Sequence, residues 1–163
     1  QMAIMDNVQT TVTQQSYDQF AEDDKAATLK AKGGSYGGGS GNLSIDGTKV
    51  RRLTPLECER LQGYPDGWTD IGEWVDTKGK RHKESSDAAR YKALGNSIAL
   101  PPWRFVLYRL CMQLGKIGTM ASLFDGIGGF PLIWEQINGK GSCLWASEIE
   151  EFPIAVTKRR FGE

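Results

Sequence analysis

The segment SLFDGIGGF, from Ser122 to Phe130, sets three glycines directly after residues that favour a β-strand. Gly126, Gly128 and Gly129 would let the chain turn tightly at the end of that strand. They would also present backbone N–H groups at the start of the next helix, which favours a polar or anionic ligand there. The spacing is G-x-G-G and not the G-x-G-x-x-G of dinucleotide sites, so a tight turn without a ligand is an equal alternative.

A second candidate group is Glu148, which follows the next predicted strand and lies about 20 residues beyond the glycines. In nucleotide-binding βαβ units, a carboxylate at this place holds the ribose hydroxyls. The glycine turn and the carboxylate together favour a cofactor site over a plain turn.

Alternating strands and helices are predicted around these residues. The pattern indicates a strand over 119–124, a helix over 130–137, a strand over 142–146 and a helix over 152–161. A βαβα unit of this kind implies two parallel strands joined by a right-handed crossover. The glycine turn and Glu148 would then lie at the ends of its two strands.

Three residues upstream predict the start of another helix. Thr54 suits the N-cap, Pro55 suits the first helical position, and Glu57 completes a capping box. This helix is predicted over 55–62, and Gly63 would end it.

Two more helices are predicted, over 87–94 behind a Ser86 cap and over 102–114. The second has apolar residues on one stripe, namely Trp103, Val106, Leu107, Leu110 and Leu114. The single histidine, His82, lies among charged residues and is predicted to be a solvated surface residue.

The first third of the chain predicts strands over 8–14, 27–32 and 48–53, where Val and Thr are frequent or apolar and polar residues alternate. Residues 33–42 contain six glycines in ten positions. This composition suits either a flexible linker or a loop that must lie close against a ligand.

Charge and cysteine content narrow the class of protein. The 163 residues carry 20 basic and 20 acidic side chains, but residues 51–120 carry 12 and 8. This basic excess suits either a polyanionic partner or a mixed solvated surface. Three cysteines without a CxxC pair predict a reducing, cytoplasmic location and no disulfide framework. No apolar run approaches the length of about 18 residues that would span a bilayer, so no membrane partner is expected.

Four segments resemble the motifs of the DNA (cytosine-5)-methyltransferases, which bind S-adenosylmethionine. SLFDGIGGF followed by ASEIEEFPIAVTKRRF resembles the first two motifs, RRLTPLECERLQGYPDGW the ninth, and RYKALGNSIALP the tenth. The resemblance covers roughly residues 25–163. It implies an α/β fold, with part of a Rossmann-like S-adenosylmethionine methyltransferase unit (βαβα) and a small β-rich target-recognition segment.

The resemblance also implies boundaries for three parts of the chain. Residues 1–53 would end the target-recognition region, with strands and the glycine-rich loop. Residues 54–118 would be the helical ninth- and tenth-motif region, and residues 119–163 the βαβα cofactor-binding segment.

Definite roles follow from the resemblance for single residues. Glu148 would hold the ribose hydroxyls, Ile149 would pack against adenine, and Asn96 and Ser97 would close the same pocket from the tenth-motif side. The implied cofactor-binding residues are Phe124, Asp125, Gly126, Ile127, Gly128, Gly129, Glu148, Ile149, Asn96 and Ser97, with Asp125 to Gly129 acting through their backbone.

Double-stranded DNA is the implied partner of the recognition segment. The residues expected to bind it are Gly33, Gly34, Ser35, Tyr36 and Arg52. For the ninth-motif arginines, Arg52 and Arg60, bracing a loop is the alternative to reading bases. Contacts with phosphates should weaken as salt rises.

The chain departs from the family pattern in two ways. The Pro-Cys string that supplies the nucleophile and the Glu-Asn-Val string are absent from this sequence. Cys58, Cys111 and Cys143 are predicted to be core or helix-face thiols, so no catalytic residue and no metal site are expected. In addition, the tenth motif precedes the first, which predicts a permuted arrangement or a piece of a longer or split enzyme.

The expected function is therefore part of an enzyme that transfers methyl from S-adenosylmethionine to C5 of cytosine in DNA, with this chain alone inactive. The alternative is a non-catalytic DNA- or cofactor-binding module for regulation or assembly. A two-stranded parallel unit leaves apolar edges exposed, so self-association or pairing with the rest of the enzyme is also expected.

Overall fold

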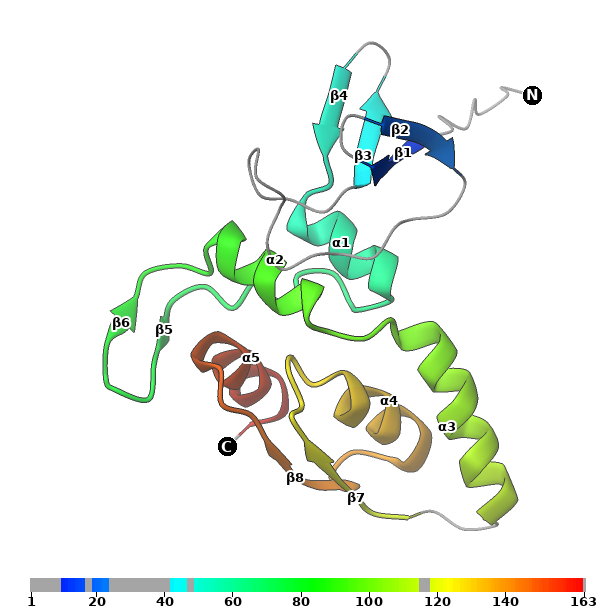
Figure 1. Ribbon diagram of the computed structural model, residues 1–163. Helices are drawn as coiled ribbons and strands as arrows, with labels where there is room; N and C mark the ends of the chain where they lie inside the picture. Colours follow the sequence, from blue (N-terminus) through cyan, green and yellow to red (C-terminus); the bar gives the residue numbers. More distant parts are fainter. Residues whose placement is uncertain (1–9, 17–18, 24–41, 47–48, 115–117, 163) are drawn as a thin grey trace, which may run out of the picture.

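The computed structural model describes residues 10–16, 19–23, 42–46, 49–114 and 118–162 (Figure 1). These residues form a mixed α/β structure with three small sheets and five helices. One sheet lies at one end of the molecule, a parallel strand pair lies toward the other end, and two helices lie between them (Figure 1).

The first sheet is antiparallel and has the order β2-β1-β3-β4. Its strands are β1 (Thr10–Ser16), β2 (Gln19–Asp23), β3 (Asn42–Asp46) and β4 (Lys49–Arg52). The predicted strands over 8–14 and 48–53 are confirmed with shifted ends. Strands β2 and β3 were not predicted, because each is short and has few apolar residues. The predicted strand over 27–32 lies outside the described residues.

Helix α1 (Pro55–Gln62) begins at the predicted capping box. The backbone N–H of Glu57 donates to Thr54 Oγ1 at 3.3 Å, and the N–H of Thr54 donates to Glu57 Oε2 at 2.7 Å. Gly63 ends the helix with a φ of 82°, a left-handed conformation that glycine adopts without penalty. Glu57 also accepts two bonds from the Arg51 guanidinium, at 2.8 and 2.7 Å, and this ion pair joins β4 to α1.

The Arg51–Glu57 pair predicts a specific acid dependence. The hydrogen bonds from Arg51 lower the pKa of Glu57 from 4.5 to about 2. A carboxyl group whose pKa is lower in the folded state stabilises the fold above its unfolded pKa and loses that contribution as the pH falls. We expect wild-type protein to lose more stability between pH 4.5 and 2 than Glu57→Gln does. Urea denaturation across this range measures the difference, and parallel curves would contradict the assignment.

The central core lies where α1 and α2 (Asp87–Gly95) meet the C-terminal unit. Ser86 caps α2 as predicted, by accepting from the N–H of Ala89 at 3.3 Å, and the helix runs one residue further than predicted. The fully buried apolar side chains of this core are Leu94, Leu100, Ile127, Ile133 and Val156. Residues of the predicted tenth-motif segment and of the glycine turn therefore share one core.

Helix α3 (Leu100–Leu114) begins two residues before the predicted start and packs along α4 (Figure 1). Its predicted apolar stripe is present, but most of it is exposed. Trp103, Val106, Leu110 and Leu114 are each more than 40% exposed, while Leu107 is half-buried. The reason is that α4 covers only one side of α3.

The C-terminal unit is the predicted succession of strand, helix, strand and helix. It consists of β7 (Met120–Leu123), α4 (Gly129–Asn138), β8 (Cys143–Ser147) and α5 (Glu151–Phe161). The two strands pair in parallel, with Leu123 opposite Ser147, which confirms the predicted orientation. No third strand pairs with them among the described residues, and Leu123, Leu144 and Trp145 are exposed. The predicted self-association stays a prediction.

A short hairpin, β5 (Trp74–Val75) and β6 (Arg81–His82), extends beside α5 (Figure 1). The His82 ring stacks on Trp74 with centroids 3.9 Å apart and lies 3.2 Å from Asp76 Oδ2. The prediction of a solvated His82 was therefore wrong, because the hairpin half-buries the ring. Within the described residues, no helix is both long and apolar enough to cross a membrane.

Candidate cofactor site

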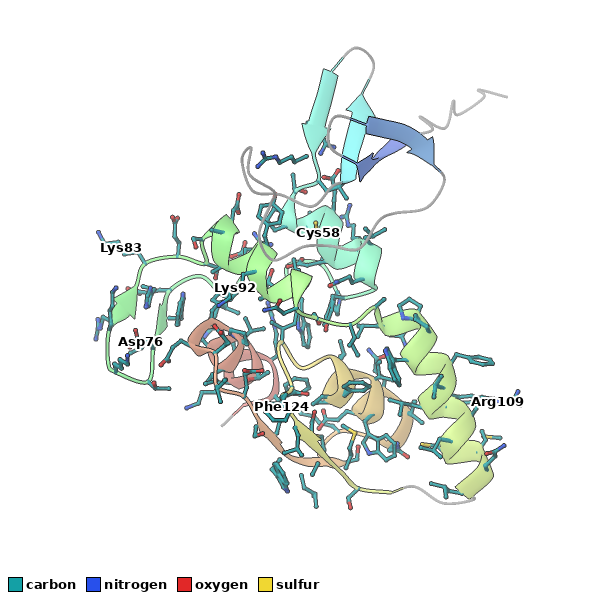
Figure 2. All side chains as sticks on the ribbon, viewed as in Figure 1. Cys58, Asp76, Lys83, Lys92, Arg109 and Phe124 are labelled. Carbon is teal, nitrogen blue, oxygen red and sulfur yellow. The ribbon has the colours of Figure 1, made fainter. Side chains whose placement is uncertain are left out.

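The chain leaves β7 through a strained turn. The N–H of Asp125 donates to Ser147 O at 3.0 Å, so the start of the turn is bound to the end of β8. Phe124 has a φ of 53°, which is the one positive φ of a non-glycine residue in the described part of the chain. Its side chain is 81% exposed, and Figure 2 shows it where β7 gives way to α4. Strain and an exposed aromatic ring together are typical of a ligand site.

The three glycines of the turn serve two different purposes. A Cβ at Gly126 would meet no atom within 4 Å, so this position is open to an approaching ligand. A Cβ at Gly128 would lie 2.5 Å from Phe161 Cε2, and one at Gly129 would lie 2.6 Å from the Tyr64 hydroxyl. Close packing against α5 and against the segment after α1 therefore requires Gly128 and Gly129.

Glu148 lies immediately after β8 and reaches the glycine turn. Its Oε2 accepts from the N–H of Gly126 at 2.6 Å, and its Oε1 accepts from the N–H groups of Ile149 and Glu150 at 2.7 and 2.9 Å. Partial burial raises the pKa of this carboxyl, but the three backbone donors outweigh that effect and leave it below its usual value. Glu148 is thus an oriented, ionised acceptor with lone pairs left for further donors.

Two exposed apolar side chains flank this carboxylate. Ile149 is 82% exposed and follows Glu148 directly, while Phe124 precedes the turn that Glu148 contacts. Apolar side chains beside a few well-placed polar groups are the usual lining of a small-molecule site. The predicted residues Phe124, Gly126, Glu148 and Ile149 are therefore brought together at the carboxyl ends of two parallel strands.

Asp125 was expected to act through its backbone, but its side chain has a distinct environment. Oδ1 accepts from Ser122 Oγ at 2.5 Å, whereas Oδ2 is buried and has no hydrogen-bond partner among the described residues. Burial raises the pKa of this carboxyl, and the nearby Glu148 adds to the effect. The side chain faces a groove of about 610 Å³ between β8 and α5.

The two tenth-motif residues lie in different surroundings. Ser97 Oγ is 2.5 Å from the Tyr64 hydroxyl, and Tyr64 in turn contacts Gly129. Asn96 lines a separate cavity of about 320 Å³ with Trp74 and the start of α5. Closure of the cofactor site by these two residues stays a prediction.

A family model for C-5 cytosine-specific DNA methylases matches residues 3–111, well over half of the chain. The chain belongs to this family. The predicted family is thereby confirmed. The matched residues end within α3, so the cofactor-side residues of the C-terminal unit lie outside the match.

Several curated relatives are DNA methyltransferases. The DNA N-6-adenine-methyltransferase of Escherichia phage P1 is 41% identical across 35% of this chain and 10% of its own length. Type II methyltransferase M.HhaI of Haemophilus parahaemolyticus is 34% identical across 55% of this chain and 23% of its own. M.Sau3AI of Staphylococcus aureus is 34% identical across 49% and 15%. The chain thus spans less than a quarter of the length of each of these relatives.

The residues predicted to bind DNA are described only in part. Gly33, Gly34, Ser35 and Tyr36 lie outside the described residues, and Arg52 is exposed at the end of β4. Arg60 forms an exposed ion pair with Asp66, at 2.6 Å, across the turn after α1. This contact fits the bracing alternative for Arg60, and both that role and a DNA contact by Arg52 stay predictions.

The cysteines of this family member have the environments of structural thiols. Cys58 on α1 is buried, and this burial together with Glu57 and Glu59 raises its pKa to about 11. Burial also raises the pKa of Cys143, and Cys111 is half-buried on α3. No cluster of three or more His, Cys, Asp or Glu side chains among the described residues could hold a metal ion.

Proposed function

We propose that this chain is part of a DNA methyltransferase that transfers a methyl group from S-adenosylmethionine to C5 of cytosine in double-stranded DNA. The C-terminal βαβα unit, residues 119–163, would be part of a Rossmann-like cofactor-binding domain. Residues 1–53 would end a β-rich target-recognition region, and residues 54–118 would join the two. Membership of the C-5 cytosine-specific family supports the reaction and the donor.

The observation that carries the proposal is the contact between Glu148 and the glycine turn. This carboxylate is held by three backbone N–H groups at the end of β8, beside the open position at Gly126. A pair of ribose hydroxyls needs an oriented, ionised acceptor of this kind. Phe124 and Ile149 offer exposed apolar surface for the adenosine part of the cofactor. The residues present therefore fit the cofactor.

Each part of the site has a separate task in binding. The open backbone at Gly126 admits the cofactor, and the N-terminal end of α4 favours its carboxylate through the helix dipole. Ser97 and Asn96 would complete the site from the tenth-motif side. When bound, S-adenosylmethionine supplies a methyl group that is activated for transfer by a positively charged sulfur.

The reaction also needs a thiol nucleophile that adds to cytosine C6. A buried Cys58 with a pKa near 11 is protonated at neutral pH, and burial also raises the pKa of Cys143. The Pro-Cys string that supplies this thiol in the family is absent from the sequence, so we place the nucleophile outside these residues and expect no methyl transfer by this chain alone. This environment equally suits the alternative function, a non-catalytic DNA- or cofactor-binding module. Transfer of labelled methyl groups to DNA by the purified chain would contradict both expectations.

Calorimetry with S-adenosylmethionine tests the cofactor site. We expect Glu148→Ala to weaken binding by about 10- to 100-fold, because a hydrogen bond to a charged group contributes about 1.5–3 kcal/mol. Asp76→Ala is the matched control, since Asp76 also accepts backbone N–H groups, from Lys78 and Lys80 at 3.0 and 2.9 Å, in the β5–β6 hairpin. The control should bind like wild type. Equal affinities of Glu148→Ala and wild type would remove the ribose assignment, and no binding by wild type would contradict the proposed site.

A further inference from the structure

The segment that follows α1 lies directly against the glycine turn. Tyr64 and Trp68 are both buried, and they reach residues about 60 positions further along the chain. In the sequence this segment resembles the ninth motif and would serve the recognition region. Its side-chain contacts lead instead to the cofactor side of the molecule.

Trp68 makes a hydrogen bond to the middle of the turn. Its indole N–H donates to the carbonyl oxygen of Ile127 at 2.8 Å, and Ile127 is fully buried. The residue four positions on is Pro131, which has no N–H with which to satisfy that carbonyl. Because a buried carbonyl without a partner is costly, the indole supplies the donor that Pro131 cannot.

The position of Trp68 is itself fixed from two sides. Arg160 on α5 donates to Trp68 O at 2.9 Å, and its guanidinium lies 5.3 Å from the indole ring. The rings of Tyr64 and Phe161 lie 5.8 and 5.9 Å away. The indole therefore presents its N–H in one defined orientation, as a positioning group requires.

Tyr64 supports the same turn two residues further on. Its hydroxyl is 2.5 Å from Ser97 Oγ and 2.6 Å from the position that a Cβ at Gly129 would take. The turn thus meets Trp68 at Ile127 and Tyr64 at Gly129. Between Leu123 and Phe130 the chain has three glycines and one strained residue, Phe124, so outside contacts must select one conformation.

We infer that Trp68 is a positioning residue for the cofactor turn. By holding the Ile127 carbonyl, it keeps the neighbouring Gly126 N–H directed at Glu148 and keeps the open side of the turn accessible. Tyr64 completes the support at Gly129. The ninth-motif segment therefore shapes the cofactor side of the molecule. The consequence for S-adenosylmethionine rests on the proposed function, whereas the consequence for the turn does not.

Hydrogen exchange on the whole chain tests this inference without any cofactor. Trp68→Phe keeps an aromatic ring but removes the donor, so exchange of the backbone amides of residues 126–129 should accelerate by about three- to tenfold. Trp134→Phe is the matched control. Trp134 is equally buried and also donates its indole N–H to a carbonyl, that of Gly118 at 3.2 Å, away from the turn. This control should leave exchange in the turn unchanged.

Equal exchange in the two variants would overturn the inference, because a general loss of stability would affect both alike. If Trp68→Phe does not fold, hydrogen exchange of the indole N–H protons in the wild-type chain tests the hydrogen bond instead. The Trp68 proton should exchange far more slowly than that of the exposed Trp145, and similar rates would refute the hydrogen bond.

Calorimetry tests whether Trp68 also affects the cofactor binding that the proposed function requires. S-adenosylmethionine should bind Trp68→Phe about three- to tenfold more weakly than it binds Trp134→Phe. Equal affinity of the two variants would overturn the positioning role. If the wild-type chain binds no S-adenosylmethionine, the proposed function fails, but the exchange result still decides how the turn is held.

Discussion

Replacing Glu59 by alanine is expected to lower the free energy of unfolding by about 3–5 kcal/mol. Glu59 is 0% exposed, and both of its carboxylate oxygens are used. Oε2 accepts from the N–H of Gly67 at 2.7 Å, while Oε1 accepts from the N–H and hydroxyl of Thr69 and from Arg90. The substitution would leave two backbone N–H groups without their acceptor and would remove the nearest carboxylate of the partly buried Arg90 guanidinium, which costs more than the lost attraction itself.

Asp66→Ala is the control for this experiment. Asp66 belongs to the Arg60–Asp66 ion pair on the outside of the same helix and turn, where both side chains are 59% exposed. Exposed pairs contribute little to stability because water and salt screen them. Urea denaturation should therefore give a clearly lower free energy of unfolding for Glu59→Ala than for Asp66→Ala. A loss below about 1 kcal/mol for Glu59→Ala would show that α1, Thr69 and α2 can rearrange around the vacated position.

Gly128→Ala is expected to lower the free energy of unfolding by about 2–5 kcal/mol, because it combines the strain of a left-handed backbone conformation with overpacking. Gly128 has a φ of 83°, which an alanine adopts only with strain. The new methyl group would lie 2.5 Å from Phe161 Cε2. Relief would require the Phe161 ring to move, and that ring packs edge-on against Trp68. The cost therefore includes contacts beyond the substituted position.

Gly126→Ala separates the two contributions. Gly126 also has a positive φ, of 61°, but nothing lies within 4 Å of its Cβ position. Gly126→Ala should therefore lower the free energy of unfolding only by the backbone strain, about 1–2 kcal/mol. Thermal or urea unfolding of both variants measures the difference. Equal costs would mean that α5 yields to the extra methyl group and that Gly128 is not needed for close packing.

The local features of the fold were predictable from short stretches of sequence. The capping box at Thr54 and Glu57, the left-handed Gly63 and the Ser86 cap all depend on residues four or fewer positions away. The glycine turn was predictable for the same reason, and the succession of strand, helix and strand around it predicted the parallel strand pair. Strands β2 and β3 were missed, because short polar strands are defined by the partner that they pair with and not by their own pattern.

The residue types of the candidate site and its position at the ends of two strands were predictable from the sequence. The meeting of Glu148 with Gly126 follows from two parallel strands ending at one edge. The contacts of Trp68 with Ile127 and of Tyr64 with Gly129 gave no signal in the sequence. They join positions about 60 residues apart, and no periodicity or spacing relates them.

Residue types and their spacing along the chain were enough to predict the family, the helix caps, the turn glycines and the carboxylate that faces them. Only the packing of distant segments shows which glycines are closely packed and which is open, that Glu59 is buried, and that most of the α3 stripe is exposed. The physical reason is the range of the forces involved. Caps and turns are satisfied by neighbours along the chain, whereas burial and close packing depend on which distant segments come to share one core.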